Sequence, residues 1–144
     1  MTAETIAIAS DHAGYDLKAS LKEMLEGEGR AVLDLGTDGR ESVDYPDFAD
    51  VIAAALKDGR AQRGILICGT GIGISIAANR HRHVRAALCH DITTARLSRQ
   101  HNDANVLVLG ARTTGIEVAR DCAATFLATP YEGGRHARRV AKLG

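Results

Sequence analysis

Three glycines follow a cysteine in the segment 68–75, which reads Cys-Gly-Thr-Gly-Ile-Gly-Ile-Ser. An apolar run precedes this segment and a helical pattern follows it, which predicts a strand end, a glycine loop and a helix start. Closely spaced glycines let backbone N–H groups converge, and a helix N-terminus adds positive potential. The loop is a candidate cradle for an oxyanion or a phosphate, with a plain tight turn as the alternative. Its spacing fits neither a dinucleotide-binding fingerprint nor a P-loop.

Cys68 and His101 are the side chains best suited to move protons. A helix N-terminus favours a thiolate, which would make Cys68 a usable base or nucleophile. His101 lies between a predicted helix and a predicted strand, where a partly exposed histidine titrates near neutral pH. A purely structural role is the alternative for both residues. We expect Cys89 and Cys122 to be buried and unreactive.

Basic residues gather in the second half of the chain. Residues 1–60 hold 13 acidic and 6 basic residues, whereas residues 61–144 hold 5 acidic and 12 basic ones. One face of a predicted C-terminal helix would present four cations at helical spacing, namely Arg135, Arg138, Arg139 and Lys142. Arginine pairs with phosphate oxygens in a bidentate manner, so this face suits a small phosphate ester. A solvated surface or a docking arm for a second subunit is the alternative.

The composition narrows the classes of partner. The 144 residues carry 18 basic and 18 acidic side chains, 3% aromatic residues and no Trp, which is unlike a nucleic acid binder. No apolar run is long enough to span a membrane and no signal-like segment follows Met1, so we expect a cytoplasmic protein. The three cysteines form no CxxC pair, and His81 and His83 fit a solvated connector, so we expect no disulfide framework and no metal site.

Five apolar runs with β-branched residues alternate with helical patterns along the chain. The predicted strands are Thr5–Ser10, Ala31–Leu35, Gly64–Cys68, Arg85–Leu88 and Val106–Leu109. This alternation predicts one domain over residues 1–144, with a three-layer α/β/α Rossmann-like fold and a five-stranded parallel sheet. The last part of this domain, residues 131–144, would be a basic helical tail.

The helical patterns carry their own start and stop signals. The first predicted helix has an apolar stripe of Leu17, Leu21, Met24 and Leu25 and stops at Gly27 and Gly29. The second begins near Pro46 with a stripe of Phe48, Val51, Ile52, Ala55 and Leu56. A third starts in the glycine cluster. Asp91 is the expected N-cap of the fourth helix, and Thr113 or Thr114 that of the fifth, which ends before Pro130.

Ligands of open parallel sheets bind at the carboxyl ends of the strands. Polar residues follow three of the predicted strands at this position. Asp11 and His12 follow the first strand, the glycine loop follows the third, and Arg112 follows the fifth. We therefore expect a binding site at this edge of the sheet.

Motifs along nearly the whole chain resemble those of the B-type ribose-5-phosphate isomerases, a family that also includes allose- and galactose-6-phosphate isomerases. The matching stretches are 10–14, 44–46, 67–79, 97–105 and 131–136. The resemblance implies an interconversion of ribose 5-phosphate and ribulose 5-phosphate through a cis-enediolate, in the non-oxidative pentose phosphate pathway. It implies no cofactor and no metal.

The same resemblance implies roles for individual residues. His101 would open the sugar ring, Cys68 would move the proton between C2 and C1, and Thr70 would support them nearby. Another branch of the family places a glutamate base where this chain has Ile74, which puts the proton transfer on Cys68. The amides that would hold the enediolate belong to Gly69, Thr70, Gly71, Ile72 and Gly73. The sugar hydroxyls would be bound by Asp11, His12 and Asn102. The phosphate would be bound by Arg112, Arg135, His136 and Arg139.

Members of this family share each site between two subunits. The resemblance therefore implies a homodimer or a dimer of dimers, with the tail packed on a partner subunit. Galactose-6-phosphate isomerases divide the site residues between two different chains, whereas this chain holds the full set, which favours a five-carbon substrate. Two alternatives stay open: an isomerase of a six-carbon sugar phosphate, and a sensor that binds a sugar phosphate without converting it.

Overall fold

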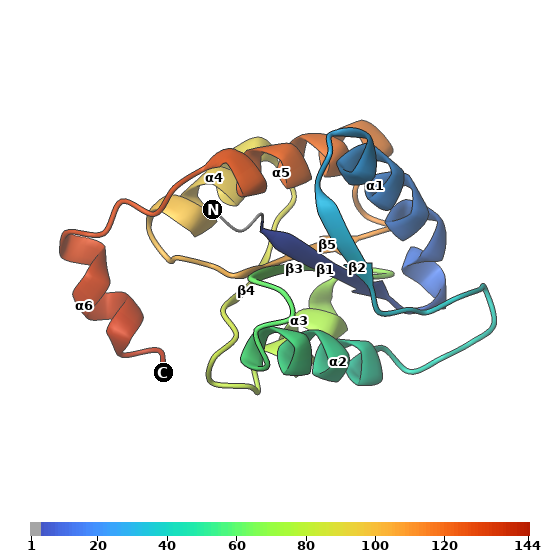
Figure 1. The fold of residues 1–144 in the computed structure, drawn as a ribbon, viewed down its shortest axis with the longest axis horizontal. Coiled ribbons are helices and arrows are strands. Elements are labelled where there is room, and N and C mark those ends of the chain that lie inside the picture. Colours follow the sequence, from blue (N-terminus) through green and yellow to red (C-terminus); the bar gives the residue numbers. More distant parts are fainter. Residues whose placement is uncertain (1–3) are drawn as a thin grey trace.

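A parallel sheet lies between two layers of helices (Figure 1) in the computed structural model, which describes residues 4–144. The strands are β1 (Thr5–Ser10), β2 (Ala31–Asp34), β3 (Arg63–Cys68), β4 (Ala86–Leu88) and β5 (Val106–Gly110). They pair in the order β2-β1-β3-β5-β4, and every pair is parallel. The α/β fold with a five-stranded parallel sheet is confirmed, and each strand lies within one residue of its predicted bounds.

Each crossover between parallel strands contains a helix, because the chain must return to the amino end of the sheet before it can add the next strand. The helices are α1 (Tyr15–Gly27), α2 (Tyr45–Lys57), α3 (Ile72–Ala78), α4 (Ile92–Gln100), α5 (Ile116–Ala128) and α6 (Arg135–Ala141). A short 3₁₀ helix, η1 (His12–Gly14), follows β1 and was not expected from the sequence.

Both faces of the sheet are buried under helices. In β1, Ile6 and Ile8 point towards the layer of α1, α4 and α5, whereas Ala7 and Ala9 point towards α2 and α3. This alternation follows from the two-residue repeat of a strand. All four side chains are completely buried, so β1 is held between the two helix layers and its carboxyl end has a defined position.

The helix boundaries follow the predicted signals in most places. Gly29 adopts φ +81° after α1, and Arg30 N–H donates to the Leu25 carbonyl, so glycine ends this helix as expected. Pro46 lies in the first turn of α2. Asp91 caps α4, since its carboxylate accepts from Thr94 N–H at 2.7 Å.

Three local predictions were wrong. The residue at the N-cap of α5 is Gly115, and no side chain caps this helix, so neither Thr113 nor Thr114 does so. Val51 is exposed on α2, because Ala53 and Ala49 take the inward positions beside Ile52. His81 and His83 do not form a merely solvated connector. His81 Nε2 pairs with Asp50 at 2.8 Å, and His83 Nε2 bonds the Ala53 carbonyl at 2.7 Å, which ties this connector to α2.

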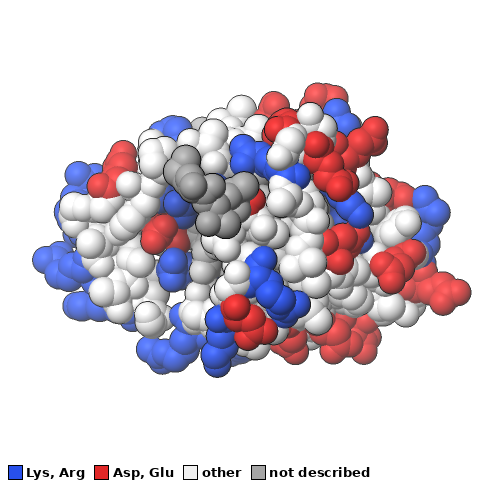
Figure 2. Space-filling model, viewed as in Figure 1, with Lys and Arg blue, Asp and Glu red and all other residues white. Residues whose placement is uncertain are grey.

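Charge is distributed unevenly between the two ends of the molecule. Lys and Arg side chains gather around α6 and below it in Figure 2, whereas Asp and Glu gather at the opposite end. Within residues 4–144, no helix is long and apolar enough to cross a membrane.

Candidate active site

Cys68 ends β3 and is followed directly by the glycine loop that leads into α3. The side chain is 5% exposed, and Gly71 N–H donates to its sulfur at 3.2 Å. Hydrogen-bond donors and a helix N-terminus both stabilise negative charge on sulfur. The structure thus places Cys68, the expected base, at the head of the glycine loop, with its sulfur in a hydrogen bond to the loop.

The loop keeps this shape because Gly71 adopts φ +78°, in the left-handed region. A Cβ atom here would lie 2.4 Å from Leu88 Cδ1, so only glycine fits. The N–H groups of Gly71 and Ile72 already donate to Cys68 Sγ and to Thr70 Oγ1. Two of the five amides expected to hold an oxyanion are therefore engaged within the loop itself.

Asp11 and His12 lie at the end of β1, beside the end of β3. Asp11 is 6% exposed, and its Oδ1 accepts from the N–H groups of Ala13 and Gly14. His12 Nδ1 accepts from Val43 N–H at 3.1 Å, so a neutral His12 carries its proton on Nε2. Backbone contacts therefore hold both side chains in place and leave Asp11 Oδ2 and His12 Nε2 for a ligand.

Arg112 completes the group at the carboxyl edge. Its N–H donates to the Gly69 carbonyl at 2.8 Å, and its guanidinium lies over Gly69, where an added Cβ would come within 3.3 Å of Nη1. Arg112 is exposed and places a positive charge directly beside the glycine loop. The edge thus combines a thiol, backbone amides and a cation.

His101 lies at the other end of the sheet. It follows the last residue of α4, and α4 runs back from the carboxyl end of β4 to the amino end of β5. The His101 ring stacks on His136 of α6, with 4.3 Å between ring centroids and 16° between ring planes. Figure 1 shows α6 at this same end of the molecule.

The remaining expected residues lie near His101. Asn102 is the next residue and is exposed, and Arg135 and Arg139 are exposed on α6, where Arg139 Nη1 donates to the Arg135 carbonyl at 3.0 Å. His136 is 8% exposed. Burial lowers the pKa of His136, and the neighbouring His101 and Arg135 charges lower it further. These surroundings therefore favour the neutral form of His136.

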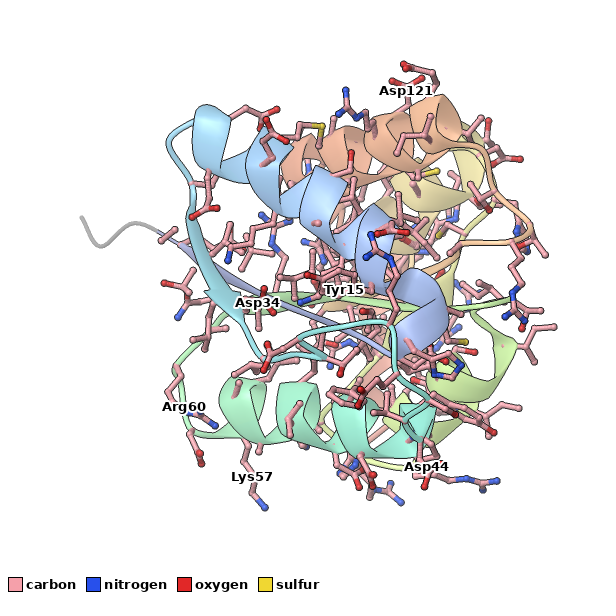
Figure 3. All side chains as sticks on the ribbon, turned by 90° about the vertical axis from the view of Figure 1, so that its right-hand side faces the viewer. Tyr15, Asp34, Asp44, Lys57, Arg60 and Asp121 are labelled. Carbon is pink, nitrogen blue, oxygen red and sulfur yellow. The ribbon has the colours of Figure 1, made fainter. Side chains whose placement is uncertain are left out.

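The expected site residues consequently form two groups within one chain. A carboxyl-edge group consists of Asp11, His12, Cys68, Gly69, Thr70, Gly71, Ile72, Gly73 and Arg112. An amino-edge group consists of His101, Asn102, Arg135, His136 and Arg139. Figure 3 views the molecule from the carboxyl edge, with Tyr15 at the start of α1 and Asp44 at the start of α2. The sheet lies between the groups, so one chain does not bring them together.

A groove of about 630 Å³ adjoins the amino-edge group. It lies between the α3–β4 connector and the C-terminal tail, and Asn102 and Leu143 both line it. The connector contributes Arg80, Arg82 and Arg85, which makes the groove basic.

Two side chains near the expected site received no role from the sequence. Tyr45, at the start of α2, lies against Gly73, where an added Cβ would come within 2.6 Å of Tyr45 Cζ. The only sequence signal for a role of Tyr45 was that it belongs to the stretch 44–46, which resembles the family. Glu132 lies 3.7 Å from His136 Nε2, and the spacing of four residues was the available signal.

Comparison with known proteins points to one family. A family model described as Ribose/Galactose Isomerase matches residues 6–143. A solved structure of Clostridium thermocellum ribose-5-phosphate isomerase B is 53% identical, with a TM-score of 0.96 over 97% of this chain and 95% of the other. Ribose-5-phosphate isomerase B of Escherichia coli is 47% identical over 94% of this chain and 91% of its own. D-erythrulose-4-phosphate isomerase of Pectobacterium atrosepticum is 45% identical over 97% of this chain and 93% of its own.

Proposed function

The chain belongs to the ribose/galactose isomerase family, and we propose that it interconverts ribose 5-phosphate and ribulose 5-phosphate through a cis-enediolate. It is an aldose–ketose isomerase of sugar phosphates. The observation that carries the proposal is the position of Cys68. Its sulfur accepts from Gly71 N–H at the head of α3, on the same edge as Asp11, His12 and Arg112.

Proton transfer is the central step of this proposal. The Cys68 thiolate removes the proton from C2 of the open-chain aldose, and the electron pair of that C–H bond forms the C1–C2 double bond. The carbonyl oxygen O1 becomes an oxyanion, which nearby amide donors stabilise. The Cys68 thiol then returns the proton to C1, O1 gains a proton and O2 loses one. The product is the ketose, and no electrons leave the substrate.

The other residues prepare the substrate for this step. His101 donates a proton to the ring oxygen and opens the furanose, while Asp11, His12 and Asn102 hold the hydroxyl groups. Arg112, Arg135, His136 and Arg139 bind the phosphate, and Thr70 supports the loop through the Ile72 N–H. Phosphate binding remote from C1 and C2 provides energy that orients the reacting carbons.

We further propose that a complete site forms between two copies of the chain. Its expected residues lie at opposite ends of one sheet, and a twofold axis brings the amino-edge group of one copy to the carboxyl-edge group of another. The single domain would then be a cytoplasmic homodimer, alone or paired into a tetramer, with residues 131–144 packed on the partner. This assembly would work without a cofactor in the pentose phosphate pathway.

Proton NMR of ribose 5-phosphate in D₂O tests the reaction. We expect ribulose 5-phosphate to appear together with deuterium at the exchanging carbon. Cys68→Ala should lose turnover by at least about a thousandfold, as expected when the base of a proton transfer is removed, yet still bind phosphate. Near wild-type turnover in Cys68→Ala would refute the role of the thiol.

The substrate itself needs a separate measurement, because one relative is a D-erythrulose-4-phosphate isomerase. We expect kcat/KM to be higher for ribose 5-phosphate than for a four-carbon or six-carbon sugar phosphate. A higher value for either of the others would overturn the assignment of the substrate and leave the isomerase class intact.

A further inference from the structure

Three ligand-type side chains converge at the amino edge, beside the tail. The ligand atoms of His101, Glu132 and His136 all lie within 4.8 Å of one another. His101 is half-buried and His136 is buried. The sequence gives little sign of this cluster, because His101 is 31 residues away from Glu132.

The backbone holds these three residues in one place. Glu132 N–H donates to the Gln100 carbonyl at 3.1 Å, which fixes the loop before α6 to the end of α4. His136 N–H donates to the Gly133 carbonyl at 3.1 Å. Main-chain contacts therefore hold the three residues close together.

Two imidazoles and one carboxylate form a common ligand set for zinc, which binds through His nitrogen at about 2.0–2.1 Å in a tetrahedral arrangement. Ligand atoms of such a site lie roughly 3.4 Å apart. Here His136 Nε2 and a Glu132 carboxylate oxygen are 3.7 Å apart, and all three ligand atoms lie within 4.8 Å of one another. Metal binding therefore requires His101 to turn out of its stack on His136, because the nitrogen lone pairs of parallel rings do not point at one ion. Glu132 is free to move, since its side chain is 51% exposed.

We propose that His101, Glu132 and His136 bind a divalent transition metal ion of the zinc class. Imidazole ligands select zinc, cobalt, nickel and copper over magnesium and calcium, which prefer oxygen. The cations of Arg135 and Arg139 on the same helix repel any metal ion, so weakly held magnesium and calcium are disfavoured further. Three protein ligands leave a fourth position open to water or to an anion.

Metal binding has a consequence for catalysis that rests on the proposed function. A metal ion on His101 withdraws one of its two ring nitrogens from proton exchange and fixes the ring away from the substrate, so we expect the bound ion to inhibit ring opening. The role of the metal is therefore inhibitory.

The test measures zinc affinity directly, by competition with a chromophoric chelator on the full chain. We expect one zinc ion per chain and no competition from Mg²⁺. Glu132→Gln should weaken zinc binding by at least about tenfold, the loss that follows even from changes around metal ligands. Glu117→Gln, on the exposed first turn of α5, is the matched control and should bind zinc like the wild type.

Cobalt provides an independent readout. Co²⁺ in a four-coordinate site gives visible d–d bands that hydrated Co²⁺ lacks at that strength, and we expect Glu132→Gln to abolish them. Zinc affinity that is unchanged in Glu132→Gln, or the absence of zinc binding, would overturn the metal site. Zinc binding that depends on Glu132 but leaves isomerisation unaffected would uphold the metal site and contradict the proposed role of His101. Basal activity of Glu132→Gln without zinc should match the wild type.

Discussion

At the scale of single residues, Gly71 links the stability of the fold to the position of Cys68, the proposed base. Its φ of +78° and the 2.4 Å approach of Leu88 leave no room for a side chain. Gly71→Ala should therefore reduce the free energy of unfolding by about 2–4 kcal/mol, since left-handed strain and overpacking add. It should also lower kcat, because the N–H donor moves away from Cys68. Urea denaturation and steady-state kinetics measure the two effects.

Gly39→Ala is the control for this substitution. Nothing lies within 4 Å of an added Cβ at Gly39, and its φ is not left-handed. We expect its stability and its kcat to match the wild type. Equal stability of Gly71→Ala and Gly39→Ala would contradict the proposed steric requirement.

Asp34, at the end of β2, forms an ion pair with Lys18, whose side chain is 3% exposed, at 2.6 Å. Burial by itself would raise the pKa of Asp34, but the hydrogen bonds from Lys18 and Gly36 and the charges of Lys18 and Lys22 outweigh it, so the pKa of Asp34 is lowered from its ordinary value. The unfolded chain thus binds a proton to Asp34 more readily than the folded one. This contribution to stability is present above about pH 4 and is lost as the pH falls through the lowered pKa.

Asp34→Asn should destabilise the protein by about 3 kcal/mol at pH 7, because the buried Lys18 charge loses its partner. Its stability should also fall less steeply than that of the wild type as the pH drops below about 4. Urea denaturation at a series of pH values gives both quantities, with the exposed Asp38→Asn as a control. A wild type and an Asp34→Asn variant with parallel pH profiles would disprove the linkage.

The sequence predicted the residues of the candidate site and, through the resemblance, a site shared between two subunits, but not which of these residues one chain brings together. The resemblance placed Cys68 and His101 in one site, and the structure places them at opposite ends of the sheet. Chain order contained a signal, since Cys68 follows a strand whereas His101 follows a helix. Residues after a crossover helix return to the amino edge in a parallel sheet. The stacking of His101 on His136 was not predictable, because it joins α4 to α6 through space.

At the scale of elements, α5 begins without a side-chain cap. Gly115 occupies the N-cap with φ −65° and ψ 156°, which any residue can adopt, and nothing lies within 4 Å of an added Cβ. Gly115→Ser should stabilise the protein by about 0.5–1 kcal/mol, through a cap hydrogen bond and a less flexible unfolded chain. The urea midpoint should rise while the m-value stays constant.

Gly115→Ala separates the two causes of this gain. Alanine restricts the unfolded chain but accepts no hydrogen bond, so it should give only part of the increase. An equal gain from serine and alanine would show that capping contributes nothing at this helix.

Local patterns were sufficient to predict which elements form, but not how the strands are ordered. Apolar runs and helical stripes located all five strands and the six α-helices, since each depends on neighbouring residues. The order β2-β1-β3-β5-β4 depends on the side of the sheet to which each crossover turns. The apolar stripe of α2 was wrong at Val51 for a similar reason. Because α2 contains many alanines, its hydrophobic pattern does not show clearly which face is buried. Packing of α2 against β1 and β3 determines that face.

At the scale of the whole molecule, charge is distributed unevenly between the two ends at which the two groups of site residues lie. Figure 2 shows the basic tail at one end of the molecule and most of the visible acidic side chains at the opposite end. A phosphate bound by Arg112 at the carboxyl edge meets Arg135 and Arg139 only if a second copy supplies them. Electrostatic attraction between opposite ends also favours such a pairing.

Complementation between two inactive variants tests this assembly. Cys68→Ala and His101→Ala should each be inactive alone, because every site lacks one proton-transfer group. Co-expression at equal levels forms mixed dimers in which one site combines the intact Cys68 of one chain with the intact His101 of the other. About half of the dimers are mixed, and one of the two sites in each mixed dimer is intact, so about a quarter of the wild-type activity should return.

Cys68→Ala with Cys68→Ser is the control and should restore nothing, since every site then lacks the thiol. Failure of the first pair to recover activity, with mixed dimers demonstrated by mass spectrometry, would mean that each chain uses its own His101.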